Sequence, residues 1–413
     1  MAYGDGTFRE WRNDGYQFRK FYSSKTDGYK KHRLVVYGKT KKECREKMKL
    51  KEEECEKHLK ELMREEKKNA FLSDNMLSWL KDKKSGRIKA TAFDRLEGII
   101  QNQIEPYGIG KTEVSIVTAE DISEHLHYLQ YECPRIRQKK GYSYSTVKKV
   151  YELFDQFFKD YYADDLNGNP MNKVEHPQPT KNVGELNVDE LEYDSEMPDI
   201  VLSDEEIKKF KEQVYLPVNS GVEGRSKYGV AFYFMMMTCL RFGEATALTW
   251  RDIDLDKREM IINKTASRVK NRDDVDKKTK RIITTPKNSR SRIVMLSSEA
   301  VEALETIRER TEYTRPTDLV LCTKNGTIVL HNEFWLRLKG TLRAAGLMNE
   351  AREKKFTPHY LRHSGISYYI RHGIPLAMVS KMAGHSSVDI TERVYYHVIH
   401  DQQKKMLEMM DGI

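Results

Sequence analysis

The sequence predicts a multidomain α+β chain. It has a small three-stranded β-sheet domain at the N-terminus, a helical domain, and a mainly helical third domain that holds a small β-sheet. Three observations predict this organisation. Two Asp-Gly pairs separate aromatic and β-branched runs near the N-terminus, apolar residues recur at helical spacing in the middle, and a helix-start pattern follows a long polar segment. The length of 413 residues fits two or three domains better than one.

The N-terminal stretch "FREWRNDGYQFRKFYSSKTDGYKKHRLVVYG" contains both pairs, Asp14-Gly15 and Asp27-Gly28. Asp-Gly between such runs is a strong hairpin signal because the tight turn requires positive φ. Two successive hairpins make a three-stranded sheet. Basic residues alternate with aromatic residues along it: Arg12, Arg19, Lys20, Lys30, Lys31 and Arg33. A charged ribbon of this kind can read a DNA groove, although a solvated sheet face has the same pattern.

The net charge of +9 is concentrated at the N-terminus. Residues 1–50 hold 14 Lys and Arg against 6 Asp and Glu, while the other 363 residues hold 58 against 57. A basic module on a nearly neutral body favours a nucleic-acid partner, with solubility as the simpler explanation. A highly charged stretch with a thin apolar seam then runs to Lys68. We interpret it as a solvated connecting helix, so that the first domain covers residues 1–68.

Residues 69–166 are predicted to form a helical domain. Two apolar stripes at helical spacing mark its helices: Leu72, Met76, Trp79 and Leu80, and then Val147, Val150, Tyr151, Phe154 and Phe158. Between them, "RIRQKKGYSYS" places Arg137, Lys139 and Lys140 next to a helix start. Backbone N–H groups and cations together suit phosphate contacts. A solvated basic loop is an equal alternative.

Residues 167–202 are rich in Pro, Asn, Gly and acidic residues, a composition typical of a linker. In "LSDEEIKKF", Ser203 and Glu206 then form a capping-box pattern that opens a third domain over residues 203–413. The run "VAFYFMMMTCL" at 230–240 is about half the length of a membrane span and predicts a buried core helix. The N-terminus shows no apolar signal region, and five scattered cysteines indicate reduced thiols in a cytosolic protein.

The third domain carries several short motifs with chemically active residues. In "TCLRFGEATALTW", Arg241 lies one helical turn before Glu244, which by itself indicates an arginine–carboxylate pair at the edge of a core. "RIITTPKNSRSRIVML" predicts a β-hairpin with Lys287 near its turn. In "AGHSSVDITERVYYHV", a glycine helix stop precedes His385, and Tyr395 follows ten residues later.

The motif "TPHYLRHSG" predicts a helix start, with Thr357 as the cap and Pro358 in the first helical position. His359, Arg362 and His363 then share one face by i, i+3, i+4 spacing. A helix start carries a positive dipole and unpaired N–H groups. Three potential cations at that position therefore indicate a nearby anion.

Together these residues suit phosphodiester chemistry without a metal. A phosphoryl transition state spreads negative charge over its non-bridging oxygens, which guanidinium forks match. Histidines shuttle protons near neutral pH, and a lysine can protonate a leaving alkoxide. A tyrosine can act as an oxygen nucleophile and hold a covalent intermediate. We therefore expect a site that uses no metal and no cofactor.

The order Arg…Lys…HxxR…GH…Y, with the last two motifs nearly intact, resembles tyrosine recombinases (integrases), especially those of conjugative transposons and temperate phages. The resemblance implies the tyrosine recombinase fold. It makes residues 1–68 an arm-site DNA-binding domain, 69–166 a core-DNA-binding domain and 203–413 the catalytic domain. It also implies a catalytic set: Arg241, Lys287, His359, Arg362, His385 and Tyr395.

In that family the arginines clamp the scissile phosphate and the lysine protonates the departing 5′-hydroxyl. The histidines assist proton transfer, and the tyrosine attacks to give a 3′-phosphotyrosine link. The resemblance selects Tyr395, two residues before His397, as the nucleophile and leaves Tyr396 as a packing residue. His363 is typically a supporting neighbour, and Cys239 stands where many relatives have glycine.

The implied activity is site-specific recombination that integrates and excises a mobile genetic element in the cytoplasm of a prokaryotic cell. The protein would be a monomer or weak oligomer alone and a tetramer on double-stranded DNA, at core and arm sites. An excision factor or a host DNA-bending protein would be further partners, and no membrane is involved. The tail residues Met406, Leu407 and Met410 resemble a helix that docks onto a neighbouring protomer, with packing on their own domain as the alternative.

Three other functions stay open at this level. A metal nuclease could use the alternating carboxylates of "RDIDLD", but the glycine and glutamate of a calcium loop are missing, and Tyr360 replaces the glutamate of HExxH. A type IB topoisomerase-like enzyme would share the tyrosine chemistry without paired sites. A DNA-binding regulator with a decayed recombinase site is disfavoured because the residue set is complete.

Overall fold

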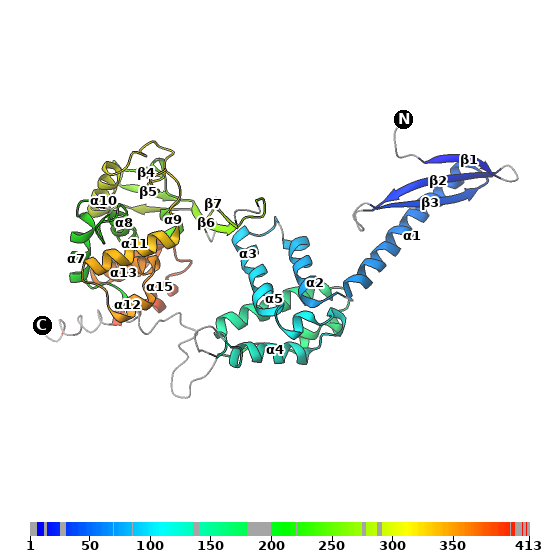
Figure 1. The fold of residues 1–413 in the computed structure, drawn as a ribbon, viewed down its shortest axis with the longest axis horizontal. Coiled ribbons are helices and arrows are strands. Elements are labelled where there is room, and N and C mark those ends of the chain that lie inside the picture. Colours follow the sequence, from blue (N-terminus) through cyan, green and yellow to red (C-terminus); the bar gives the residue numbers. More distant parts are fainter. Residues whose placement is uncertain are drawn as a thin grey trace. The chain divides into compact units, whose positions relative to one another are not determined.

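The computed structural model describes residues 6–11, 15–24, 30–68, 70–84, 86–134, 140–179, 200–219, 221–274, 278–286, 291–396, 398–400, 407 and 410. The chain divides into two compact units, Met1–Thr180 and Lys181–Ile413 (Figure 1). The division falls inside the segment 167–202 that the composition predicts to be a linker. No described helix is long and apolar enough to cross a membrane. The five cysteines, all in the described part, form no disulfide.

The first unit begins with an antiparallel sheet in the order β1 (Thr7–Trp11), β2 (Gly15–Ser23) and β3 (Lys31–Gly38), followed by helix α1 (Lys41–Lys68) (Figure 1). The predicted three-stranded sheet is therefore present. Phe18, Leu34 and Val36 of the sheet are buried together with Cys44 and Met48 of α1. The prediction of a solvated connecting helix is wrong for the start of α1, because the thin apolar seam of this helix covers one face of the sheet.

The basic residues of the sheet are divided between its two faces, because successive side chains of a strand point to opposite sides. Lys20 is paired in register with Leu34, whose side chain is buried under α1, and its Nζ lies 2.7 Å from Oε1 of Glu52 in α1. Lys20 thus faces the helix, in contrast to its expected place beside the other DNA-contacting cations.

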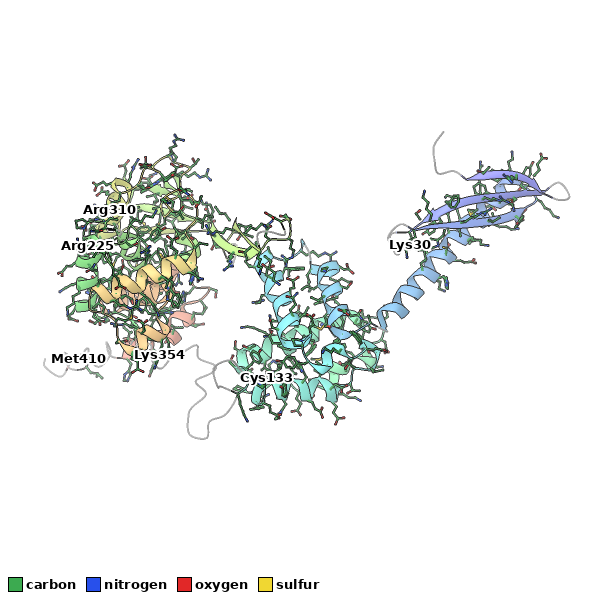
Figure 2. The ribbon with its side chains drawn as sticks, in the orientation of Figure 1. Lys30, Cys133, Arg225, Arg310, Lys354 and Met410 are labelled. Carbon is green, nitrogen blue, oxygen red and sulfur yellow. The ribbon has the colours of Figure 1, made fainter. Side chains whose placement is uncertain are left out.

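The remaining cations of the predicted DNA-binding ribbon are less enclosed. Arg33 on β3 is exposed and lies opposite the exposed Phe21 on β2, and Arg19 is partly exposed. Lys31 is exposed at the start of β3, as is Lys30 just before it (Figure 2). Arg12 lies outside the described residues.

The rest of the first unit is a helical domain with four α-helices in its described part: α2 (Leu72–Trp79), α3 (Ala90–Ile99), α4 (Ala119–Tyr131) and α5 (Tyr144–Tyr161). Both predicted apolar stripes pack in or against its core. The core continues past the expected boundary at residue 166, since Met171 and Val174 are buried in it. Lys140 is exposed beside Pro134, whereas Arg137 and Lys139 lie outside the described residues.

The second unit is mainly helical around the apolar helix α8. Its described helices are α7 (Asp204–Tyr215), α8 (Gly229–Met237), α9 (Phe242–Ala245), α10 (Ser298–Glu309), α11 (His331–Ala344), α12 (Glu350–Lys355), α13 (Pro358–Arg371), α14 (Leu376–Ala383) and α15 (Val388–Val394). Every residue of α8 is buried, as the run of apolar residues predicts, and α7, α10 and α13 pack against it. The capping box of Ser203 and Glu206 begins α7 as predicted. Ile200 and Leu202, inside the predicted linker, already belong to the core.

Two small antiparallel sheets accompany these helices. One has the order β4 (Ile253–Asp254), β5 (Glu259–Ile262) and β8 (Arg292–Met295), and the other pairs β6 (Thr265–Lys270) with β7 (Thr279–Thr284). The predicted hairpin around Lys287 is therefore wrong, because β7 and β8 belong to different sheets. Val294 of β8 pairs with Met260 of β5, and both are buried in the helical core. Burial against the core, which local sequence does not show, decides the pairing.

Candidate active site

Arg241 begins the short helix α9, directly after α8 and a tight turn at Cys239. Its Nη1 donates to Oε1 of Glu244 at 3.0 Å, and its Nη2 donates to the carbonyl oxygen of Gly384 at 3.2 Å. The predicted arginine–carboxylate pair is present, and Glu244 is buried while 35% of the Arg241 side chain stays exposed. The pair therefore orients Arg241 without closing it off from a ligand.

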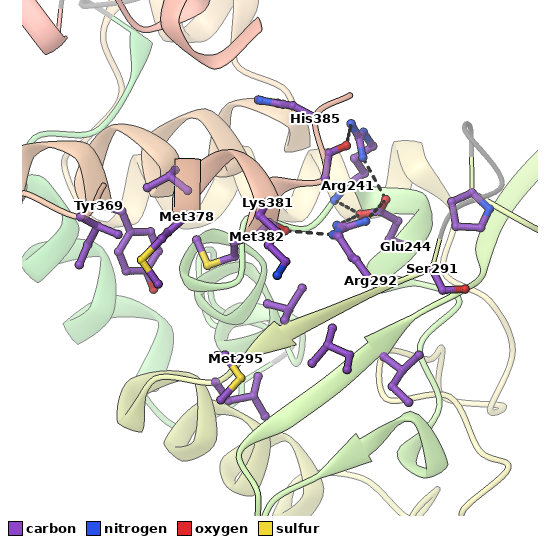
Figure 3. A pocket seen from close by; sticks show the side chains of 18 of the residues that line it. Arg241, Glu244, Ser291, Arg292, Met295, Tyr369, Met378, Lys381, Met382 and His385 are labelled. Carbon is purple, nitrogen blue, oxygen red and sulfur yellow. Dashed lines mark hydrogen bonds and ion pairs between the residues drawn. The ribbon is translucent and has the colours of Figure 1, made fainter. Parts of the chain in front are cut away.

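Arg292 of β8 completes this network, and no sequence pattern marked it. Its Nη1 and Nη2 donate to the two carboxylate oxygens of Glu244 at 3.0 and 2.8 Å, and its Nε donates to the carbonyl oxygen of Met382 at 3.0 Å (Figure 3). Burial raises the pKa of Glu244, but the hydrogen bonds and charges of Arg292 and Arg241 outweigh it and hold this pKa below its usual value. An ionised Glu244 thus ties β8, α9 and the end of α14 together.

Arg362 is the deepest cation of the cluster, with 1% of its surface exposed. Thr357 and Pro358 begin its helix, α13, as predicted, although Thr357 makes no side-chain capping bond. Nη1 of Arg362 donates to the carbonyl oxygen of Cys239 at 2.8 Å. Its Nη2 is buried without a hydrogen-bond partner among the described residues. A buried donor without a partner is costly, and an anionic ligand would supply the missing acceptor.

Three histidines lie close to Arg362. The rings of His359 and His363 meet edge to face with centroids 4.6 Å apart, and His385 Nδ1 is hydrogen-bonded to Thr391 Oγ1 at 2.7 Å. His359 is exposed to solvent, and His385 is partly exposed. Desolvation by the surrounding protein, followed by the charges of the nearby arginines, lowers the pKa of His359 to about 4 and that of His385 to about 3. Desolvation and the arginines together therefore favour the neutral form of both histidines while no anion is bound.

Tyr395 follows α15 and is fully buried. Its hydroxyl lies 2.5 Å from Nδ1 of His363. Burial raises the pKa of Tyr395, against the opposing charge of Arg362, so the phenol is protonated when no substrate is present. Tyr396 is 59% exposed and stacks on His400, in contrast to the expectation that it packs inside the domain.

The structure brings five of the six predicted catalytic residues together, because Arg362 interacts electrostatically with each of the other four: Arg241, His359, His385 and Tyr395. Lys287 lies outside the described residues. Two of the three carboxylates of the alternative metal-nuclease interpretation pair with lysines, since Asp252 lies 2.6 Å from Lys264 and Asp254 lies 2.8 Å from Lys257.

Sequence reasoning missed the immediate roles of Arg292, His363 and Thr391. Arg292 had no local signal because its partner Glu244 is 48 residues away in the chain. His363 did have one, since it shares a helix face with His359 and Arg362, but it was assigned only a supporting position. Thr391 lies on α15, where its hydrogen bond to His385 links the helix before Tyr395 to the cationic cluster.

A pocket of about 1300 Å³ adjoins Arg241 and His385 and is lined by residues of β5, β8 and α14 (Figure 3). Much of its lining is apolar: Ile261, Ile293, Met295, Ile374, Met378 and Met382. Met295 and Met378 are 61% and 64% exposed. The pocket is thus an apolar surface beside a cationic one, with room for a short apolar segment.

The cluster as a whole can bind an anion and pass a proton. Guanidinium groups at fixed positions offer donors to phosphate-like oxygens, neutral histidines can accept protons, and a buried phenol can attack as an oxygen nucleophile. All three functions meet at the side chains of α13, the end of α14 and the end of α15.

The chain is similar to several known recombinases and integrases. Residues 201–402 match the phage integrase family model. A tyrosine recombinase XerC-like protein of Caldanaerobacter subterraneus subsp. tengcongensis is 27% identical over 397 residues, which cover 92% of each chain. The prophage ps2 probable integrase of Lactococcus lactis subsp. lactis is 24% identical over 355 residues, which cover 83% of each chain.

Among solved structures, the Tn1549 transposon integrase in complex with transposon right end DNA aligns with a TM-score of 0.58 and 18% identity. The alignment covers 83% of this chain and 100% of that chain. At that identity the likeness concerns the fold, and it confirms the predicted fold class. Residues 201–402 thus form a domain of the phage integrase family, and the chain as a whole is similar to tyrosine recombinases and integrases.

Proposed function

We propose that this recombinase cleaves and rejoins DNA at specific sites through a 3′-phosphotyrosine intermediate, and that it integrates and excises a mobile genetic element. The observation that carries the proposal is the buried guanidinium of Arg362, whose Nη2 has no partner among the described residues and which lies beside the enclosed Tyr395. A phosphodiester would fill that donor position and meet the nucleophile. The prophage and transposon integrases among the relatives support the mobile-element role.

Each residue of the cluster takes one role in this proposal. Arg241 and Arg362 bind the non-bridging oxygens of the scissile phosphate, and Tyr395 attacks the phosphorus. His359 and His385 donate hydrogen bonds to the phosphate and assist proton transfer. Lys287 protonates the 5′-oxygen as it leaves. Glu244 and Arg292 hold Arg241 in place through the network described above.

Covalent trapping on nicked duplexes tests the proposal. The duplexes carry the terminal sequences of the element that encodes the protein, and the reactions contain EDTA, with a parallel set that contains added metal instead. We expect wild type and Tyr396→Phe to form a protein–DNA adduct and Tyr395→Phe to form none. Cleavage that requires added metal and leaves no adduct would contradict both the tyrosine mechanism and its metal independence. Binding without cleavage would instead favour the regulator.

DNA is the proposed partner of the N-terminal sheet, at arm sites, and of the helical domain that follows it in the first unit, at core sites. The exposed cations of the sheet, such as Arg33, support the first assignment. Phosphate contacts release counterions, so affinity should fall steeply with salt. Deletion of residues 1–68 should abolish arm-site binding in a mobility-shift assay and leave core-site binding in place.

We further propose that four protomers assemble on two DNA sites, helped by an excision factor or a host DNA-bending protein, in the cytoplasm of a prokaryotic cell where the element resides. The apolar pocket beside Arg241 supports docking of an apolar tail, and Leu407 and Met410 are exposed. Deletion of residues 401–413 should reduce tetramer formation on DNA, measured by mass photometry, while binding of one protomer to one site persists. If two DNA sites still pair normally after this deletion, the tail has no role in assembly of the tetramer.

A further inference from the structure

We propose that His363 is the general base that takes the proton of Tyr395 as the phenol attacks the scissile phosphate. The inference rests on the proposed function, because it assigns a role within the same cleavage step. His363 lies one residue after Arg362 and was expected only as a supporting neighbour in α13. The geometry around the tyrosine hydroxyl gives it a direct role.

His363 contacts the reacting atom of Tyr395 directly. His363 Nδ1 lies 2.5 Å from Tyr395 Oη, and among the described residues no other hydrogen-bond partner of this hydroxyl is present. A general base must be within hydrogen-bond reach of the proton that it removes. In the tautomer that carries its proton on Nε2, the imidazole of His363 presents a lone pair on Nδ1 to the phenol.

The other two histidines of the cluster make contacts elsewhere. His385 uses Nδ1 for its bond to Thr391 at 2.7 Å. His359 contacts the ring of His363 edge to face rather than the tyrosine hydroxyl. His359 and His385 are therefore suited to hydrogen bonding with the phosphate oxygens. Of the three histidines, His363 is the one that contacts the phenol hydroxyl.

The surroundings of His363 keep its imidazole neutral before substrate binds, so that it can accept a proton. Burial first, and then His359, Arg362 and His385, hold the pKa of His363 well below its usual value, so its Nδ1 lone pair is available before substrate binds. A phosphate that binds the arginines adds negative charge beside the imidazole. That charge raises the affinity of His363 for a proton at the step where the proton must move.

Cleavage exchanges one bond at phosphorus for another and moves a proton at each of the two oxygens. The Tyr395 Oη–P bond forms, the P–O5′ bond breaks, and the phenol proton moves to Nδ1 of His363. In the proposed function Lys287 supplies the proton that the 5′-oxygen needs. On rejoining, the 5′-hydroxyl passes its proton back to Lys287 and attacks, the O5′–P bond forms, the Oη–P bond breaks, and His363 returns its proton to the departing phenolate.

The test compares His363→Asn with wild type on the nicked duplex that wild type cleaves. An asparagine can still hydrogen-bond the tyrosine but cannot take its proton. We expect the adduct to form about 10²–10³-fold more slowly. His372→Asn, at the exposed end of the same helix, is the matched control and should react like wild type. His363→Gln replaces the first variant if thermal unfolding shows that His363→Asn is poorly folded.

Chemical rescue separates a base from a structural residue. Replacement of Tyr395 by 3,5-difluorotyrosine, a more acidic phenol, should restore at least about tenfold of the lost rate in the His363 variant, because an acidic phenol depends less on a base. DNA with a 5′-bridging phosphorothiolate, which eases departure of the leaving group, should not restore it.

The proposal is overturned if the His363 variant cleaves within about threefold of wild type. It is also overturned if a folded variant is rescued by the phosphorothiolate and not by the fluorinated tyrosine. If wild type itself forms no adduct on these duplexes, the proposed function fails, and that outcome is distinct from a defect confined to His363.

Discussion

The candidate active site and the N-terminal sheet both gather cations, but they hold them in opposite environments. In the site, Arg362 is 1% exposed, and Arg292 and Arg241 are bound to the buried carboxylate of Glu244. On the sheet, Lys31 and Arg33 are exposed to solvent on a strand surface. One region fixes each charge at a defined position, and the other presents charge on an open face.

The difference matches the roles that we propose for the two regions. Transition-state stabilisation requires donors that are already in place, because reorganisation during the reaction would cost free energy. Such preorganisation lowers the stability of the free protein, because a buried donor without a partner is unfavourable. Binding to a DNA backbone needs only charge near phosphates, so flexible exposed cations are sufficient. Mutations should therefore act on rate and stability in the site and on affinity and its salt dependence on the sheet.

The largest expected effect is on the rate after Arg362→Lys. A lysine keeps the charge but loses the fork that can reach both Cys239 and a phosphate, so we expect adduct formation to fall by about 10³-fold. Arg371→Lys on the same helix, where Arg371 pairs with Asp204 at 2.6 Å, is the control and should change the rate little. Cleavage by Arg362→Lys within about tenfold of wild type would show that the buried position has no special importance.

A second large effect is expected on stability after Glu244→Gln. Loss of this buried carboxylate leaves two arginines without their shared partner, which should lower the free energy of unfolding by about 3 kcal/mol in urea titrations. The rate should also fall, because Arg241 loses its orientation. Glu223→Gln, which removes an exposed partner of Arg343, should cost less than about 1 kcal/mol. Equal losses in both variants would contradict the contrast between buried and exposed pairs.

On the sheet, Arg33→Ala should weaken arm-site binding, and the slope of log affinity against log salt should become shallower by about 1. Lys20→Ala provides the comparison within one sheet, because Lys20 faces α1 and pairs with Glu52. It should change the slope less and lower the unfolding midpoint slightly. Fluorescence anisotropy at several salt concentrations measures both variants. A larger slope change for Lys20 would show that the helix-covered face contacts DNA.

The smallest expected effect is the acid sensitivity of the DNA-free protein. The pKa of His359 is lowered to about 4 and that of His385 to about 3, whereas both titrate near 6.5 when unfolded. Between about pH 6.5 and 4 the unfolded chain therefore binds more protons, so the free energy of unfolding should fall as pH falls through this window. Thermal unfolding across this range should show a shallower dependence of the unfolding midpoint on pH for His385→Gln than for wild type.

Added sulfate should raise the thermal unfolding midpoint by filling the anion site. No response to sulfate would argue against a preformed site.

Local patterns were enough to predict much of the fold. The sheet of β1 to β3 followed from two turn signals, α5 and α8 from apolar periodicity or apolar runs, and the start of α7 from a capping box. The failures share a cause. The hairpin around Lys287 and the solvated start of α1 were wrong because each segment packs on a partner distant in sequence.

The residues of the candidate site also differ in whether local sequence predicts them. The residue types and spacing of Arg241, His359, Arg362, His385 and Tyr395 were visible in the sequence, because a recombinase motif is a local pattern of chemically active side chains. Arg292 and the contact between His363 and Tyr395 were not, since each joins elements that lie 32 to 48 residues apart.

The sequence by itself determined that this chain is basic at its N-terminus, multidomain, and equipped with the chemistry of a tyrosine recombinase. Only the tertiary structure decided which cations are buried, which of them share Glu244, which face of the sheet Lys20 occupies, and which histidine meets the hydroxyl of Tyr395. The physical reason is that residue type and short-range spacing are written locally along the chain. Burial and hydrogen bonding arise only when distant segments pack together.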